Sequence, residues 1–143
     1  MEKLKYQAYS QATQTVAPSR QIVLLYDGVI RSIQQAKEAI SEKRIEDRYN
    51  LLLKATDLVG GLQGCLDFDK GGEIAKVLYS YYAGIEARLF TIQRSNSVSD
   101  CDLVISDLKQ MRDAWADIDA GAGENATPQT PQIPDEINIG AVV

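Results

Sequence analysis

The stretch IVLLYDGVIRSIQQAKEAI, residues 22–40, decides the fold class of this chain. Its apolar side chains recur every three or four residues, which places them along one side of an α-helix. Pro18 precedes the stretch and suits the first turn of a helix, where its missing N–H would be unpaired in any case. The pattern therefore predicts a helix that begins near Pro18 and buries one apolar stripe. The stripe consists of Ile22, Leu25, Val29, Ile33, Ala36 and Ile40.

Three later stretches repeat the helical period. The second predicted helix covers about residues 45–66, the third opens after Gly71 and Gly72, and the fourth opens near Ser99 or Asp100, which are suitable capping residues. We find no alternation of period two that is long enough for a β-strand. Because the connections are short, neighbouring helices have to run in opposite directions. The sequence predicts an all-α protein, an antiparallel up-down-up-down four-helix bundle with flexible N- and C-terminal segments.

The 143 residues suffice for one domain with a hydrophobic core. We expect a flexible segment or short cap helix at residues 1–17, the bundle at 18–119, and a tail with Pro and Gly at 120–143. The tail ends with more apolar residues than a solvated linker needs, so one hypothesis is that it occupies a groove of the empty protein. These residues are Ile133, Ile137, Ile139, Val142 and Val143.

The acidic composition narrows the range of partners. The formal net charge is −5 and the estimated pI is near 4.7. Nucleic acids and anionic membrane surfaces select basic proteins, so we expect neither as the main partner. No apolar run approaches the ~18 residues that a membrane-spanning helix needs, and the N-terminus lacks a secretory signal. We therefore expect no membrane insertion and a cytoplasmic location.

The chain contains no histidine, which removes the usual general base and the commonest transition-metal ligand. We expect no enzyme activity, no cofactor and no metal, because di-metal sites in helix bundles rely on Glu-x-x-His repeats. Cys65 and Cys101 fall near apolar positions and predict buried free thiols. Four carboxylates fit helix caps and helix ends better than a metal site or an acid–base site. They are Asp27, Asp67, Asp69 and Glu73.

The predicted helices carry more apolar residues than one stripe requires. Each such side chain would gain about 1.5–3 kcal/mol from full burial, so leaving several of them in water is unfavourable. Two interpretations stay open: the core stripes are broad, or the additional residues line a groove for an apolar segment of a partner. The candidate groove residues are Val23, Tyr26, Ile30, Leu52, Val59 and Tyr82.

Three short motifs occur in a fixed order along the chain. They are LYDG at 25–28, LDFDKGGEIA at 66–75 and DAW at 113–115. In this order and at these separations they resemble the FliS family of flagellar secretion chaperones, over residues 6–118. The resemblance implies a cytoplasmic export chaperone that binds the C-terminal region of flagellin. Such a protein prevents premature polymerisation and helps deliver the subunit to the flagellar type III export apparatus.

The resemblance also implies further partners. Tyr6 and Tyr9 correspond to an aromatic N-terminal segment that contributes, in the family, to docking on the cytosolic domain of the export gate. The alternative function is an adaptor that binds a regulatory protein such as an anti-sigma factor. Either function requires reversible burial of apolar surface and no covalent chemistry.

Overall fold

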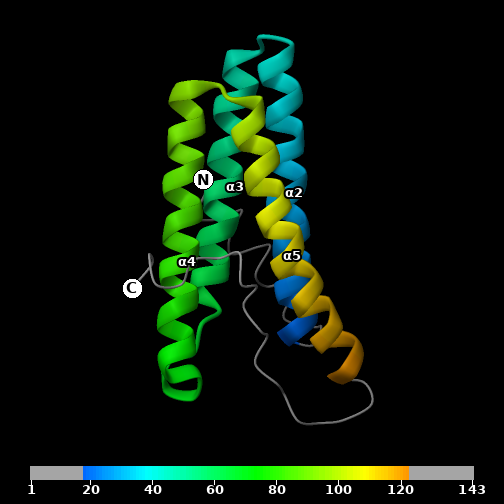
Figure 1. Cartoon of the computed structure of the whole chain (residues 1–143), viewed down its shortest axis with the longest axis vertical. Helices are drawn as coiled ribbons and strands as arrows, with labels where there is room; N and C mark the ends of the chain where they lie inside the picture. The colour runs from blue at the N-terminus through cyan, green and yellow to red at the C-terminus, as the bar shows by residue number, and fades with distance from the viewer. Residues whose placement is uncertain (1–17, 123–143) are drawn as a thin grey trace.

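The computed structural model describes residues 18–122, which form four α-helices joined by short connections (Figure 1). Consecutive helices run in opposite directions, so the predicted antiparallel four-helix bundle is confirmed. No strand occurs between residues 18 and 122. The predicted terminal segments, apart from the end of α5, lie outside the described residues. The helices are α2 (Pro18–Ser41), α3 (Ile45–Gly64), α4 (Phe68–Ser95) and α5 (Val98–Ala122).

Helix α4 begins earlier than the sequence pattern predicted. The carboxylate of Asp67 accepts hydrogen bonds from the backbone N–H groups of Asp69 and Lys70, both at 3.0 Å, and so caps the helix at Phe68. Gly72 lies inside the helix with a φ of 51° and a ψ of −126°, which marks a kink. Glycine adopts this conformation without the steric cost that a side chain would impose. The sequence predicted that this helix starts after Gly71 and Gly72, but that position is the kink, and the first turn of α4 lies before it.

The connection between α4 and α5 also differs by a few residues from the prediction. Asn96 ends α4 in the left-handed conformation, with a φ of 54°. The hydroxyl oxygen of Ser97 accepts a hydrogen bond from the N–H of Asp100 at 3.1 Å, so α5 begins at Val98. The predicted caps, Ser99 and Asp100, lie in the first turn of the helix instead.

The four helices do not share their contacts equally. Helix α2 packs extensively against both α3 and α5, whereas α4 packs mainly against α3 and contacts α5 at few positions. One hydrophobic cluster fills the space between them, and it contains the predicted stripe of α2 from Leu25 to Ala36. The largest fully buried aliphatic side chains are Ile33, Leu52, Leu62, Ile85, Leu89, Ile92, Leu108 and Met111.

The two cysteines are free thiols, as predicted. Cys101 is buried in the cluster, but the prediction of burial was wrong for Cys65, which is exposed. Cys65 is the residue that caps the C-terminal end of α3, where the chain turns toward α4. A position that continues a helical stripe beyond the last turn has no neighbouring helix to cover it.

Candidate binding surface

The six residues that we assigned to a groove lie inside the bundle. None of their side chains is more than 6% exposed, and all but Val23 belong to the central cluster. The first interpretation is therefore correct for the free bundle: the broad stripes are core packing. Contact between these residues and a partner would require the helices to separate, so their place in a binding groove stays a prediction.

Tyr82, which we assigned to a groove, forms a buried link between α4 and α2. The hydroxyl of Tyr26 donates a hydrogen bond to the hydroxyl of Tyr82 at 2.9 Å, and the ring centroids are 6.2 Å apart. Burial raises the pKa of both phenols well above the ordinary value, because it disfavours the phenolate. Both hydroxyls are paired, so this polar contact in the core carries little penalty.

The inward-facing stripe of α4 loses its cover toward the start of the helix. Ile74 belongs to the same stripe as Leu78, Tyr81 and Ile85, at spacings of four, three and four residues. Those three side chains are buried, but Ile74 is 40% exposed. In Figure 1, α5 leans away from α4 toward the end of the bundle where α4 begins. Ile74 therefore continues a stripe that is otherwise core, but its own side chain is only partly covered.

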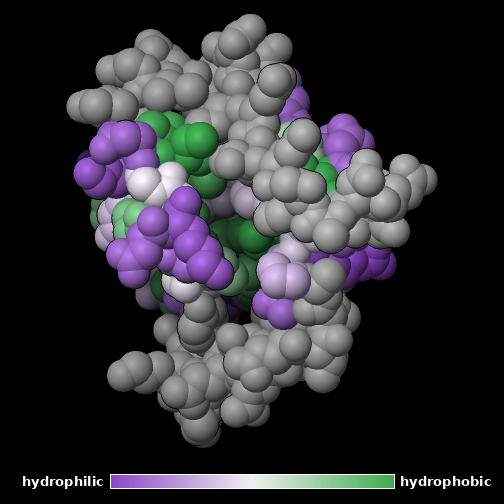
Figure 2. All heavy atoms as spheres, turned by 90° about the horizontal axis from the view of Figure 1, so that it is seen from below, coloured by the Kyte–Doolittle hydropathy of each residue, from purple (hydrophilic) through white to green (hydrophobic). Residues whose placement is uncertain are grey.

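Helix α5 shows the same trend on the opposite side of the gap. Leu108 and Met111 are fully buried, whereas Trp115 and Ile118, which continue their stripe, are only half-buried. Figure 2 views this end of the bundle from below and shows hydrophobic side chains deep in its middle, between hydrophilic rims. We use the name α4–α5 opening for the partly exposed apolar side chains of α4 and α5 near this end, which are Ile74, Trp115 and Ile118. Ile22 and Leu66 lie half-buried at the same end.

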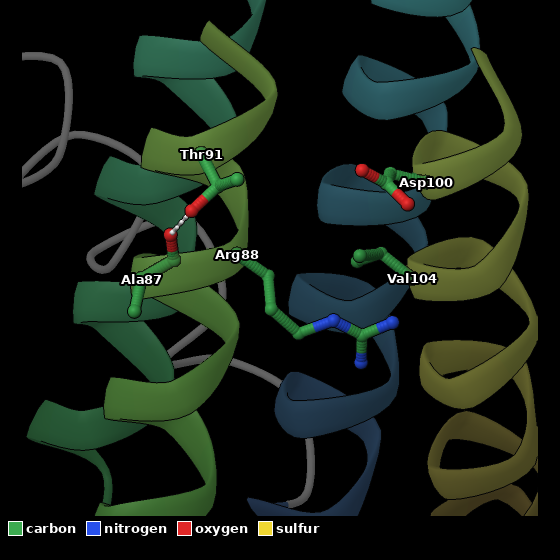
Figure 3. A pocket seen from close by; sticks show the side chains of 5 residues that line it. All are labelled: Ala87, Arg88, Thr91, Asp100 and Val104. Carbon is green, nitrogen blue, oxygen red and sulfur yellow. Dashed lines mark hydrogen bonds between the residues drawn. The ribbon is translucent and has the colours of Figure 1, made fainter. Parts of the chain in front are cut away.

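Farther along the same boundary, α4 and α5 enclose a shallow pocket of about 250 Å³. The side chain of Arg88 extends from α4 across the gap toward α5 (Figure 3), where its guanidinium pairs with the carboxylate of Asp107. The two helices are therefore joined here by an ion pair rather than by close apolar packing. The pocket is lined by Ala87, Arg88, Thr91, Asp100 and Val104.

Several large hydrophobic side chains are exposed outside the opening. Phe68 and Tyr79 contact each other on the outer side of α4, with ring centroids 6.1 Å apart. The exposed side chains of Ile45, Phe90 and Leu103 have no aromatic contact of this kind among the described residues. The sequence did not single out these positions, because isolated exposed hydrophobic residues carry no periodic signal.

The motifs of the sequence converge on the open end of the bundle. Asp27, of the LYDG motif, accepts a hydrogen bond from Arg112 at 2.9 Å, and Arg112 directly precedes the DAW motif. Asp67, in the LDFDKGGEIA motif, caps α4 at the same end. The motif residues therefore pair α2 with α5 through Asp27 and Arg112, and start α4 through Asp67.

The carboxylates that the sequence analysis singled out have structural roles where the structure gives their partners. Residues 18–122 contain no group of three or more His, Cys, Asp or Glu side chains that could hold a metal ion. Glu73 pairs with Lys76 at 3.2 Å, and Asp27 and Asp67 have the structural roles given above. Within this part of the chain, no helix combines the length and the apolar character that spanning a membrane requires. Tyr6 and Tyr9 lie outside the described residues.

Together these features define a class: a small all-α bundle whose distinctive surface is an apolar opening between two helices. Comparison with known proteins then gives the family. The sequence model described as "Flagellar protein FliS" matches residues 1–122. The chain belongs to the FliS family of flagellar secretion chaperones, and the resemblance found in the sequence is confirmed.

Relatives from several bacteria carry the same description. The "Flagellar secretion chaperone FliS" of Campylobacter jejuni is 32% identical over 116 residues, which covers 80% of this chain and 91% of that protein. "Flagellar secretion chaperone FliSB" of Pseudomonas aeruginosa is 35% identical over 98 residues, or 68% of this chain and 78% of that protein. The Salmonella typhimurium protein is 28% identical over 117 residues, 78% of this chain and 87% of its own length.

Proposed function

We propose that this chain binds the C-terminal segment of flagellin along the boundary between α4 and α5, in the cytoplasm. Binding covers an apolar surface of flagellin and so prevents premature polymerisation. The observation that carries this proposal is the exposed end of an inward-facing stripe. Ile74 is 40% exposed although it continues the stripe of Leu78 and Tyr81, and Trp115 is only half-buried.

An apolar segment of a partner fits the opening for two physical reasons. Exposed apolar side chains gain about 1.5–3 kcal/mol each on full burial, which favours a helix or strand seated between the two stripes. In addition, the hydroxyl of Tyr81 is buried beside the gap and has no hydrogen-bond partner within residues 18–122. Buried polar groups are usually paired, so a segment that moved α4 and α5 apart could offer a backbone carbonyl to this hydroxyl.

The bound segment has to be released again for export. A segment that orders on binding loses about 2–5 kcal/mol of the gross contact energy, which keeps such a complex reversible. Following the family resemblance, we infer that the chaperone helps deliver flagellin to the type III export apparatus. Tyr6 and Tyr9 are the candidate contacts with the cytosolic domain of the export gate.

The proposal is tested by replacing Ile74 with Asp in the full chain and measuring the Kd for a flagellin C-terminal fragment by calorimetry. Because Ile74 is already 40% exposed, the substitution should leave the helical circular dichroism signal unchanged. We expect the Kd to rise about 10-fold or more, because binding would place the charge of Asp in an apolar contact, where it loses its hydration. Leu103→Asp, at an exposed position away from the opening, is the matched control.

The outcomes distinguish two questions: whether flagellin is the partner, and whether it binds at the α4–α5 opening. If the unmodified chain does not bind the fragment, flagellin is not its partner. If both variants bind as tightly as the unmodified chain, flagellin is the partner but the α4–α5 opening is not its site.

A further inference from the structure

Three strongly exposed apolar side chains lie near one another at the boundary between α3 and α4. Phe90 and Ile45 are 68% and 67% exposed, and Tyr49 is 51% exposed. The start of α3, which carries Ile45 and Tyr49, lies beside the end of α4, which carries Phe90, at the upper end of the bundle in Figure 1. Exposed apolar side chains that adjoin one another indicate an interface with another protein.

Two hydrogen bonds hold these parts of α3 and α4 in register. The side-chain N–H group of Gln93 donates to the carbonyl oxygen of Tyr49 at 3.0 Å. The guanidinium of Arg48 donates to the side-chain oxygen of Asn96. Phe90 precedes Gln93 by three residues, so it lies on the same side of α4, toward α3. Its exposure then places it at the outer edge of the boundary between the two helices.

Leu53 completes an apolar surface across this boundary. It follows Tyr49 by four residues on the same side of α3 and is half-buried. Because the helices are antiparallel, counting four residues onward from Tyr49 and three residues back from Gln93 reaches the same height, so Leu53 lies level with Phe90. We use the name α3–α4 face for this surface, which consists of Ile45, Tyr49, Leu53 and Phe90.

Opposite charges flank the α3–α4 face, one on each helix. Arg94 follows Phe90 by four residues on α4, and Glu46 precedes Tyr49 by three residues on α3. Both charged side chains are exposed, and within residues 18–122 neither belongs to an ion pair. The same counting from the bond between Gln93 and Tyr49 places them two residues, or ~3 Å, apart in height. The face therefore has a negative edge on α3 and a positive edge on α4.

We propose that the α3–α4 face binds a second copy of the same chain about a two-fold axis parallel to the bundle. In a two-fold interface the same surface of both copies takes part, and every contact occurs twice. With the axis along the bundle, α3 of each copy faces α4 of the other at the same height. Phe90 then packs against Leu53 of the partner subunit, and Arg94 pairs with Glu46 of the partner subunit.

A second copy fits the face because the face is complementary to itself. Its apolar residues lie on both helices at matching heights, and its two edges carry opposite charges that face each other after the two-fold rotation. Aromatic residues and arginine are also enriched in protein interfaces. The inference goes beyond the proposed function and does not depend on it, so it is tested without flagellin.

The first experiment measures the mass of the full chain by analytical ultracentrifugation at protein concentrations from about 1 μM to about 1 mM, which span the Kd values of weak interfaces. The average mass should rise toward that of two chains as the concentration rises. Phe90→Asp should raise the Kd of the dimer about 10-fold or more, because each dimer would place two carboxylates in apolar contacts. Leu103→Asp adds the same charge at an exposed position on α5 and is the matched control. Both variants should keep the helical circular dichroism signal, since both side chains are exposed.

The second experiment reverses the charges at the edges of the face. Glu46→Arg and Arg94→Glu each bring like charges together in both symmetry-related pairs, so each variant alone should dimerise about 10-fold or more weakly. A mixed dimer of the two variants joins opposite charges in both pairs. An equimolar mixture should therefore regain the dimer Kd of the unmodified chain.

Three results would overturn the proposal. The mass of one chain at every concentration would show that a second copy does not bind, and would leave the α3–α4 face to a different protein. Equal dimer Kd values for the unmodified chain and Phe90→Asp would place the contact on another surface. A mixture that dimerises no better than either variant alone would refute the two-fold pairing of Arg94 with Glu46.

Discussion

The core position of Leu52 leads to a prediction that separates packing from partner binding. Leu52 lies on α3, is fully buried and belongs to the central cluster. Replacing it with alanine removes buried methyl groups and leaves a cavity, which costs about 2–5 kcal/mol. Small domains have a free energy of unfolding of only ~5–15 kcal/mol, so the substitution removes a large share of the total.

The assay is urea unfolding followed by far-UV circular dichroism, with Leu103→Ala as the matched control. Leu103 is 57% exposed on α5, so the same truncation there should change the free energy of unfolding by less than about 0.5 kcal/mol. The result that would refute the assignment is a loss below ~1 kcal/mol for Leu52→Ala together with weaker flagellin binding. Leu52 would then line a surface that a partner contacts, as the groove interpretation of the sequence held.

Two other predictions concern buried polar groups. Tyr82→Phe should destabilise the bundle by about 1–3 kcal/mol, because it leaves the hydroxyl of Tyr26 buried without an acceptor. The double variant with Tyr26→Phe should lose less stability than the sum of the two single changes. Additive losses in urea unfolding would contradict the hydrogen bond. Burial, together with the neighbouring Asp102 and Asp100, raises the pKa of the Cys101 thiol to about 11. At pH 8 a thiol reagent should therefore label the exposed Cys65 rapidly and Cys101 slowly. Neutral Cys101 should contribute fully to the free energy of unfolding below pH 9.0, the ordinary pKa of a thiol. This contribution should be lost as the pH rises through about 11.

The sequence predicted the helices well because their signal is local. Apolar residues at spacings of three and four determine which side of a helix faces inward, and the predicted stripe of α2 from Leu25 to Ala36 lies in the buried cluster. The starts of α4 and α5 were predicted less well. Asp67 and Ser97 cap these helices through hydrogen bonds to backbone groups, and several nearby residues could have filled the same role.

The binding surface was harder to predict because burial depends on what lies opposite a residue. Val23 and Ile30 looked surplus to one stripe, but α2 contacts both α3 and α5 and therefore buries a wide sector. Ile74 continues the buried stripe of α4 and yet is 40% exposed, near the end of the bundle where α5 leans away from α4. Periodicity states where a side chain points, and the distance to the neighbouring helix decides whether the side chain is covered.

The unequal packing of the four helices has a consequence for how the protein admits a guest. Tilting α4 outward disrupts one extensive interface, the one with α3, whereas displacing α2 would disrupt two. Local opening therefore requires the least free energy at α4, in line with the general spread of stabilities within a folded domain. Under the proposed function, a bulky segment would widen the gap by displacing α4 alone, while α2, α3 and α5 keep their contacts with one another.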